Sequence, residues 1–159
     1  MTPVTKHGAI LLKTDLGFEN TGVLNPAIVQ EGNTVHMFYR AVKTGNYSTI
    51  GYCRLEGPLK IVERYDVPVL FPQEVYESHG VEDPRISKID DVYYLSYTAY
   101  DGLNAMGAYA TTKVLPHFEK KGLLTPQITF EQFQKLAESK TPLNKKYLRF
   151  NRQLLAKRT

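Results

Sequence analysis

The chain has 159 residues, of which 42% are hydrophobic and 23% charged, a balance that excludes a disordered polypeptide and is typical of one folded domain. It contains no run of 18 apolar residues, so no membrane-spanning helix is expected. The net charge of +4 is carried by residues 140–159, which hold seven Lys or Arg and no acid.

Two stretches of the chain resemble each other at an offset of 58 residues. The first joins residues 25–28 through a short turn to residues 35–41, and the second joins 83–86 to 93–99. Pro26 then aligns with Pro84 and Tyr39 with Tyr97 without a gap. The shared turn length favours an internal repeat over a chance similarity between two strands.

Alternation of β-branched and aromatic residues, broken by Gly-Asn, Asp-Asp and Asp-Gly turn signals, predicts four strands in each repeat. The predicted strands span 26–31, 34–41, 48–55 and 59–64, then 85–90, 92–99, 106–112 and 117–121. Within 34–41, period-2 geometry places Val35 and Tyr39 on one face and His36 and Arg40 on the other. Four antiparallel strands repeated at a fixed spacing indicate an all-β fold, with propeller blades over 25–64 and 83–121.

A closed propeller needs at least four blades, so residues 1–159 are interpreted as one partial β-propeller domain. We expect self-association or pairing with a missing C-terminal half, because one face of the second repeat (Tyr93 to Tyr97 and 106–112) would otherwise be uncovered. Residues 128–159 are predicted to hold a short helical insert near 129–139, capped by Thr129, and the basic tail. Aromatic and leucine residues in that tail favour packing on a structural partner over nucleic-acid binding, so we expect no nucleic acid and no membrane as partners. The N-terminus lacks a secretory h-region, which favours the cytoplasm, or the periplasm if a signal has been removed.

The densest polar cluster is Gly-Val-Glu-Asp-Pro-Arg-Ile at residues 80–86. Strand alternation predicts Glu82 and Asp83 on opposite faces, so that both cannot easily enter one pocket. Arg85 falls on the same face as Asp83 and could pair with it, while Pro84 biases Asp83 toward extended geometry. A surface turn with a structural ion pair is the alternative. By the repeat, Asn25 is the counterpart of Asp83, and the two would lie side by side around a propeller axis.

These strings resemble glycoside hydrolase family 130, which contains β-mannoside phosphorylases and some mannosidases. The resemblance covers about residues 15–125 and is carried by Asn-Pro-Ala at 25–27, Phe-Tyr-Arg-Ala at 38–41, Ser-Thr-Ile-Gly-Tyr at 48–52, the 80–86 string and Tyr-Thr-Ala-Tyr-Asp-Gly at 97–102. It implies a five-bladed β-propeller, here about two to three blades, with the active site in the central funnel.

The resemblance also implies a function. Asp83 would be the general acid, protonating the leaving oxygen through a sugar hydroxyl while inorganic phosphate attacks with inversion. Substrate-binding positions would be Asn25, Arg40, Ser48, Arg85 and Asp101. The implied activity is inverting phosphorolysis of β-mannoside oligosaccharides, with phosphate as co-substrate and no cofactor. The alternatives are a β-mannoside hydrolase, or a truncated, non-catalytic sugar-binding propeller fragment.

Other residues with reactive side chains carry weaker signals. Cys53 is interpreted as a buried packing residue and His36 as a packed, hydrogen-bonded one. The sequence leaves open whether His79, four residues before Asp83, reaches the pocket. No Cys/His cluster indicates a metal site.

Overall fold

The computed structural model describes residues 3–124 and Lys135. Residues 3–124 form strands and one short 3₁₀ helix, which confirms the all-β fold class. The elements are β1 (Gly22–Glu31), β2 (Thr34–Lys43), β3 (Tyr47–Glu56), β4 (Lys60–Arg64), η1 (Val75–Glu77), β5 (Gly80–Ile89), β6 (Val92–Tyr100), β7 (Ala105–Thr112) and β8 (Glu119–Leu123). The helical insert expected near 129–139 and the basic tail lie outside the described residues, Lys135 apart. No helix in the described part of the chain is long and apolar enough to cross a membrane.

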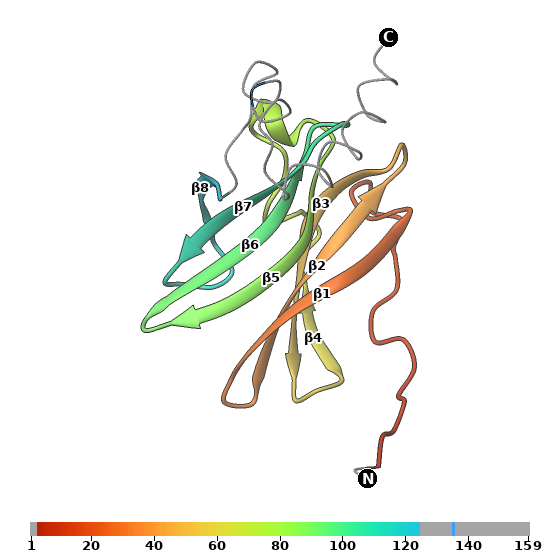
Figure 1. The fold of residues 1–159 in the computed structure, drawn as a ribbon. Helices are drawn as coiled ribbons and strands as arrows, with labels where there is room; N and C mark the ends of the chain where they lie inside the picture. Colours follow the sequence, from red (N-terminus) through yellow and green to blue (C-terminus); the bar gives the residue numbers. More distant parts are fainter. Residues whose placement is uncertain (1–2, 125–134, 136–159) are drawn as a thin grey trace. The chain divides into compact units, whose positions relative to one another are not determined.

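The strands form two antiparallel groups of four, here called blade 1 (β1–β4) and blade 2 (β5–β8), which lie side by side in Figure 1. A single parallel pairing between Ser48 of β3 and Gly80 of β5 joins the two blades into one open sheet. The strands of residues 3–124 do not close into a ring. The architecture is that of a partial propeller, as expected.

The repeat is visible in the pairing register of the two blades. In blade 1, Ile28 pairs with Met37, and in blade 2 Ile86 pairs with Leu95, both partners being displaced by 58 residues. The inner strands β1 and β5 start four and five residues earlier than predicted. The prediction began the first strand at Pro26 and the other just after Pro84, whereas each observed strand continues through its proline with a local shift of register.

The main core lies between the two blades. Phe38 and Tyr52 of blade 1 are tilted against each other at 5.1 Å and pack with Leu95 and Tyr97 of blade 2. Tyr93, Leu95 and Tyr97 are only 2%, 0% and 3% exposed. The expectation that this run would be uncovered is therefore wrong, because this face of blade 2 is turned toward blade 1.

The opposite face of blade 1 is covered by the N-terminal segment. Leu11 and Phe18 pack against a second buried cluster that includes Met37, Tyr39 and Cys53. Burial raises the pKa of the Cys53 thiol to about 11, so this residue is a packing group, as the sequence indicated.

The linker between the blades is fixed to blade 1 by backbone hydrogen bonds. Ile50 donates its N–H to the carbonyl of Leu70 and accepts from the N–H of Val69, both at 2.8 Å. Leu70 is consequently 4% exposed, within the core between the blades. Leu12 precedes Leu70 by 58 residues, at the corresponding place before blade 1, and is 69% exposed.

Candidate functional site

The site is built on two matching β-bulges, one in the first strand of each blade (β1 and β5). The β1–β2 register shifts between Leu24 and Ala27, and the β5–β6 register shifts between Glu82 and Arg85. Asn25 and Asp83 occupy these bulges, and both have a φ of 50°. Asn and Asp are the non-glycine residues that accept this left-handed conformation most readily. The proline that follows each of them cannot donate a ladder hydrogen bond, which is tolerated at a bulge.

The bulge conformation corrects the expectation that Pro84 would keep Asp83 extended. It also brings the two bulge residues together, because Asn25 Nδ2 donates to Asp83 Oδ1 at 2.6 Å. The repeat-based prediction that these side chains lie side by side thus agrees with the structure.

The two carboxylate oxygens of Asp83 have different surroundings. Oδ1 accepts from Asn25 Nδ2 and, at 3.3 Å, from Arg40 Nη1. Oδ2 has no hydrogen-bond partner among the described residues, and the side chain is 39% exposed. Two donors directed at Oδ1 leave Oδ2 as the oxygen that can carry a proton or meet a ligand.

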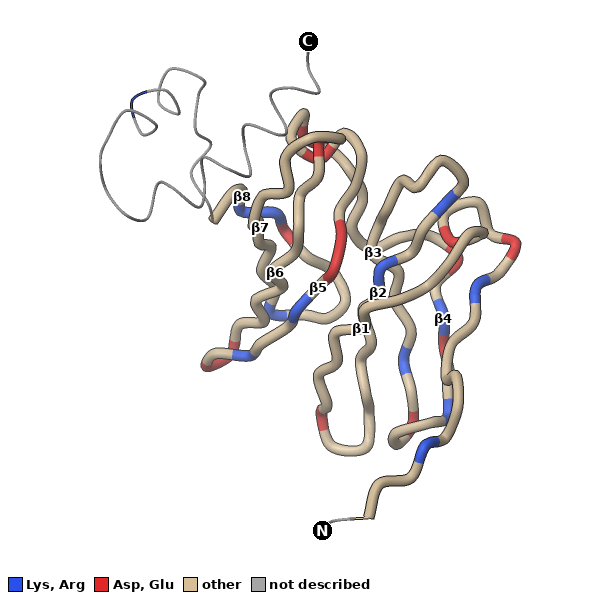
Figure 2. Tube along the Cα trace, turned by 45° about the vertical axis from the view of Figure 1, so that its right-hand side comes forward, with Lys and Arg blue, Asp and Glu red and all other residues tan. Residues whose placement is uncertain are grey.

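Arg40, on β2, donates hydrogen bonds to neighbouring side chains from all three nitrogens of its guanidinium group. Nε donates to Ser48 Oγ at 2.9 Å and Nη2 donates to Glu82 Oε1 at 2.7 Å. Ser48 Oγ in turn donates to Glu82 Oε1 at 3.1 Å. The acidic stretch of β5 that takes part is coloured red in Figure 2. These contacts join five side chains into one hydrogen-bonded group, here called the Arg40 cluster. It consists of Asn25, Arg40, Ser48, Glu82 and Asp83.

Glu82 is the member of this cluster that the sequence reasoning excluded. Alternation predicted that Glu82 and Asp83 could not easily share a pocket, and this is wrong, since both contact Arg40. The bulge with its positive φ at Asp83 breaks the alternation between successive side chains. A signal was present in the repeat, because Glu82 is the counterpart of Leu24, a polar residue where the first copy has an apolar one.

The hydrogen bonds of Arg85 and Asp101 described here are made with groups other than the Arg40 cluster. Arg85 is exposed, pairs in register with Ser96, and donates to the carbonyl of Pro84 at 2.7 Å, so the guanidinium paired with Asp83 is that of Arg40 and not of Arg85. Asp101 Oδ1 accepts the backbone N–H groups of Leu103 and Asn104 at 2.8 and 2.6 Å. Its carboxylate thereby shapes the turn between β6 and β7. Sugar binding by Arg85 and Asp101 stays a prediction.

His79 is held in an aromatic group next to the cluster. Its ring stacks on Tyr47 at 5.2 Å, meets Tyr100 edge-on at 6.1 Å, and lies against Gly102. An ideal Cβ on Gly102 would fall 2.7 Å from the imidazole, so only glycine fits there. The carbonyl of His79 accepts the N–H of Ser48 at 3.4 Å. The residue thus supports the strand junction beside the site, and its contact with a ligand stays a prediction.

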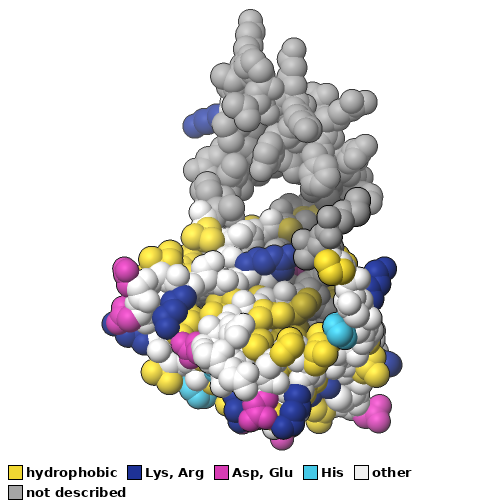
Figure 3. All heavy atoms as spheres, turned by 90° about the horizontal axis from the view of Figure 1, so that it is seen from below, with side chains coloured by type: hydrophobic (Ala, Val, Ile, Leu, Met, Phe, Trp, Pro, Cys, Tyr) yellow, Lys and Arg dark blue, Asp and Glu magenta, His cyan; other side chains and the backbone are white. Residues whose placement is uncertain are grey.

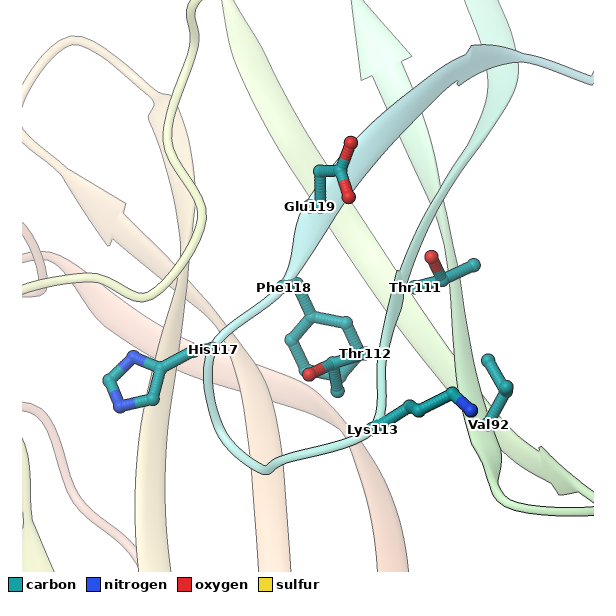
Figure 4. A pocket seen from close by; sticks show the side chains of 7 residues that line it. All are labelled: Val92, Thr111, Thr112, Lys113, His117, Phe118 and Glu119. Atoms are coloured by element: carbon teal, nitrogen blue, oxygen red, sulfur yellow. The ribbon is translucent and has the colours of Figure 1, made fainter.

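A separate groove of about 480 Å³ lies at the connection between β7 and β8. Figure 4 shows its lining side chains, which are Val92, Thr111, Thr112, Lys113, His117, Phe118 and Glu119. None of them belongs to the Arg40 cluster. Within residues 3–124 and Lys135, no group of three or more His, Cys, Asp or Glu side chains is placed to hold a metal ion.

The family model for glycoside hydrolase family 130, described as beta-1,4-mannooligosaccharide phosphorylase, matches residues 12–158. The chain belongs to this family. A beta-1,2-mannobiose phosphorylase from Thermoanaerobacter sp. (strain X514) is 41% identical over 98 residues, which are 54% of this chain and 32% of the relative. A 1,2-beta-oligomannan phosphorylase from the same organism is 33% identical over 126 residues, covering 72% of this chain and 42% of the relative.

Solved structures show the same fold. A glycoside hydrolase from Bacteroides ovatus ATCC 8483 matches with a TM-score of 0.69 at 24% identity, over 80% of this chain and 42% of that protein. The beta-1,2-mannobiose phosphorylase from Listeria innocua, solved with beta-1,2-mannobiose, matches with a TM-score of 0.57 at 16% identity, over 66% and 45%. The family 130 chain described here spans about a third to two fifths of the curated Thermoanaerobacter relatives.

Proposed function

We propose that this chain supplies the general-acid part of a β-mannoside phosphorylase site. The observation that carries the proposal is the Asp83 carboxyl group, with Oδ1 held by Asn25 and Arg40 and Oδ2 left for the substrate. The names of the relatives, β-1,2-mannobiose and β-1,2-oligomannan phosphorylases, support a β-mannoside as the substrate class.

In the proposed reaction, phosphate oxygen forms a bond to the anomeric carbon while the glycosidic C–O bond breaks with inversion. The proton on Asp83 Oδ2 passes, through a sugar hydroxyl, to the leaving oxygen. Asn25 and Arg40 keep Oδ1 unprotonated and hold the carboxyl plane in place, which a general acid requires. Asn25 keeps its own side-chain oxygen as an acceptor for a sugar hydroxyl.

Phosphate is proposed to bind outside the Arg40 cluster. The cluster holds one guanidinium and two carboxyl groups, and the guanidinium nitrogens already donate to Ser48, Glu82 and Asp83. A site with more acids than cations does not favour an anion. Arg40 and Ser48 are therefore proposed to support Asp83 rather than to bind phosphate.

The test incubates the 159-residue chain with β-1,2-mannobiose, with and without inorganic phosphate, and follows the products by ³¹P and ¹H NMR. Phosphorolysis yields α-mannose 1-phosphate and mannose only when phosphate is present. Mannose released equally without phosphate would establish the hydrolase alternative. Shifts of amide signals around Asp83 with no product would establish a sugar-binding fragment, and neither shifts nor product would overturn the proposal for this chain.

We also propose that the chain associates, with itself or with further blades. Leu12 is 69% exposed although its counterpart Leu70 is buried against a neighbouring blade, which supports an open seam at this end. Hydrophobic side chains also gather across the face seen from below (Figure 3). Exposed apolar surface of this kind favours association. Sedimentation of the 159-residue chain at several concentrations tests this, and a compact monomer throughout would contradict it.

A further inference from the structure

Glu82 occupies a position at which the blade itself needs no carboxylate. Its counterpart in blade 1 is Leu24, which lies at the same place before the same kind of bulge. Leu24 is exposed, whereas the side chain of Glu82 is largely buried. The half-buried carboxylate is therefore a property of the site in blade 2 and not of the blade fold.

The contacts of Glu82 are directed at the group that holds Asp83. Its Oε1 accepts from Arg40 Nη2 at 2.7 Å and from Ser48 Oγ at 3.1 Å. Arg40 then reaches Asp83 Oδ1 with Nη1 at the longer distance of 3.3 Å. Side-chain exposures of 16% for Arg40 and 13% for Glu82 mean that solvent screens this pair only weakly.

A cation next to a carboxyl group favours its ionised form, whereas a general acid must hold a proton. Arg40 alone would therefore work against the role proposed for Asp83. Glu82 lies closer to Arg40 than Asp83 does and carries the opposite charge, so it offsets the guanidinium. Among the described residues, the other hydrogen-bond partners of Asp83 and Arg40 are Asn25 from β1 and Ser48 from β3, and both are neutral.

We infer that Glu82 is a positioning residue, which locks Arg40 in the orientation that reaches Asp83 Oδ1 and compensates its charge so that Asp83 can keep a proton on Oδ2. This inference rests on the proposed function, in which Asp83 is the acid. The contacts of Glu82 and its effect on the charge next to Asp83 can nevertheless be tested without any turnover. The inference also gives Arg40 and Ser48 a role in supporting the acid.

The experiment is a pH titration of the Asp83 side-chain carboxyl carbon by ¹³C NMR, in the 159-residue chain labelled at aspartate. The Asp83 signal is assigned by its loss in D83N. In E82Q, which keeps the shape and removes the charge, we expect the titration midpoint of Asp83 to fall by about half a pH unit or more, because Arg40 is no longer compensated. The matched control is S48A, which removes a hydroxyl contact but no charge and is expected to shift the midpoint by less than about 0.2.

A midpoint in E82Q that is unchanged or higher, in a chain whose amide spectrum remains folded, would overturn the inference. Should E82Q unfold, E82L places at this position the residue that blade 1 already has, and the same downward shift is expected. Because the titration needs neither substrate nor product, an inactive chain that shows the shift would count against the proposed phosphorylase activity alone.

Discussion

Glu19 and Glu77 lie 58 residues apart and make the same contact, each accepting a hydrogen bond from the buried tyrosine of the second strand in its own blade. Tyr39 donates to Glu19 at 2.9 Å and Tyr97 donates to Glu77 at 2.8 Å. Both carboxylates are fully buried. Each also pairs with a cation from the fourth strand, which is Arg64 for Glu19 at 2.8 Å and Lys120 for Glu77 at 2.5 Å. In each blade, this group of three side chains links the segment before the first strand to the second and fourth strands.

The first prediction concerns the stability contributed by Glu77. Replacing it in E77Q removes the partner of Lys120, which is itself largely buried, and should lower the free energy of unfolding by about 2–4 kcal/mol. The matched control is E56Q, which breaks an exposed pair with Lys60 and should change it by less than about 1 kcal/mol. Urea unfolding followed by circular dichroism measures both.

The same residue predicts a pH dependence. Burial alone would raise the pKa of Glu77, but hydrogen bonds from Lys120, from the backbone of Gln73 and from Tyr97 outweigh it and hold the pKa below its usual value of 4.5. A carboxyl group with a lowered pKa in the folded state stabilises the fold above its usual value, and this stability is lost as the pH falls through the folded pKa. The melting temperature should therefore drop below pH 4.5, and less steeply in E77Q. An equally steep drop in the variant would show that other acids are responsible.

The third prediction uses the counterparts Leu70 and Leu12. L70A should lower the free energy of unfolding by about 2–5 kcal/mol, because it opens a cavity in the core between the blades. L12A should lower the free energy of unfolding of the chain by itself by no more than about 0.5 kcal/mol, since this side chain is exposed. Chemical unfolding of both variants at low protein concentration checks this. A large effect of L12A would mean that Leu12 is covered in solution.

The fourth prediction separates the chemistry of Asp83 from its backbone conformation. D83N should leave the fold nearly unchanged, because an asparagine already adopts the same φ of 50° at position 25. D83A should unfold more easily by about 1–2 kcal/mol, since alanine is strained in this conformation. If the chain is active, both variants should lose about 10²–10⁴-fold in turnover, while sugar binding persists in D83N. Turnover of D83N within a fewfold of the parent would reduce Asp83 to a structural residue.

The last prediction tests the hydrogen bond across the two blades. N25D would place a second carboxylate against Asp83 Oδ1, where Asn25 Nδ2 now donates at 2.6 Å. Like charges in contact repel, so N25D should be less stable than N25G at neutral pH, and this difference should shrink in acid as a proton becomes shared. Glycine is the suitable reference because it tolerates the positive φ. Thermal unfolding of both variants from pH 4 to 8 gives the comparison.

Much of the blade structure follows from the sequence because period-2 alternation and turn residues are local signals. The predicted strand at 34–41 corresponds to Thr34–Lys43, and its two faces separate as expected, with Tyr39 and Phe38 in different buried clusters. The family and the propeller fold are likewise confirmed. The early starts of β1 and β5 were missed because a proline is normally found at the first residue of a strand, on an edge strand or at a bulge, and the sequence did not reveal the two bulges.

The site was predicted less completely because its geometry is not periodic. Four of the predicted residues do come together, because they lie at similar positions along neighbouring strands. These are Asn25, Arg40, Ser48 and Asp83. Glu82 was excluded by a rule that assumes ordinary strand dihedrals, which the φ of Asp83 violates. The pairing of Glu19 with Tyr39 was overlooked because the repeat was aligned only from Asn25 onward, although Phe-Glu at 18–19 and Tyr-Glu at 76–77 extend it.

The matching bulges at Asn25 and Asp83 have an evolutionary reading. Two copies of one ancestral blade would share the backbone kink, the proline and the register, as these two do. The two copies differ at neighbouring positions of the kink, where one has leucine and asparagine and the other has glutamate and aspartate. Divergence after duplication thus needed no new loop, only a change of side chains on an inherited turn of the backbone. The amide of blade 1 now donates to the carboxylate of blade 2.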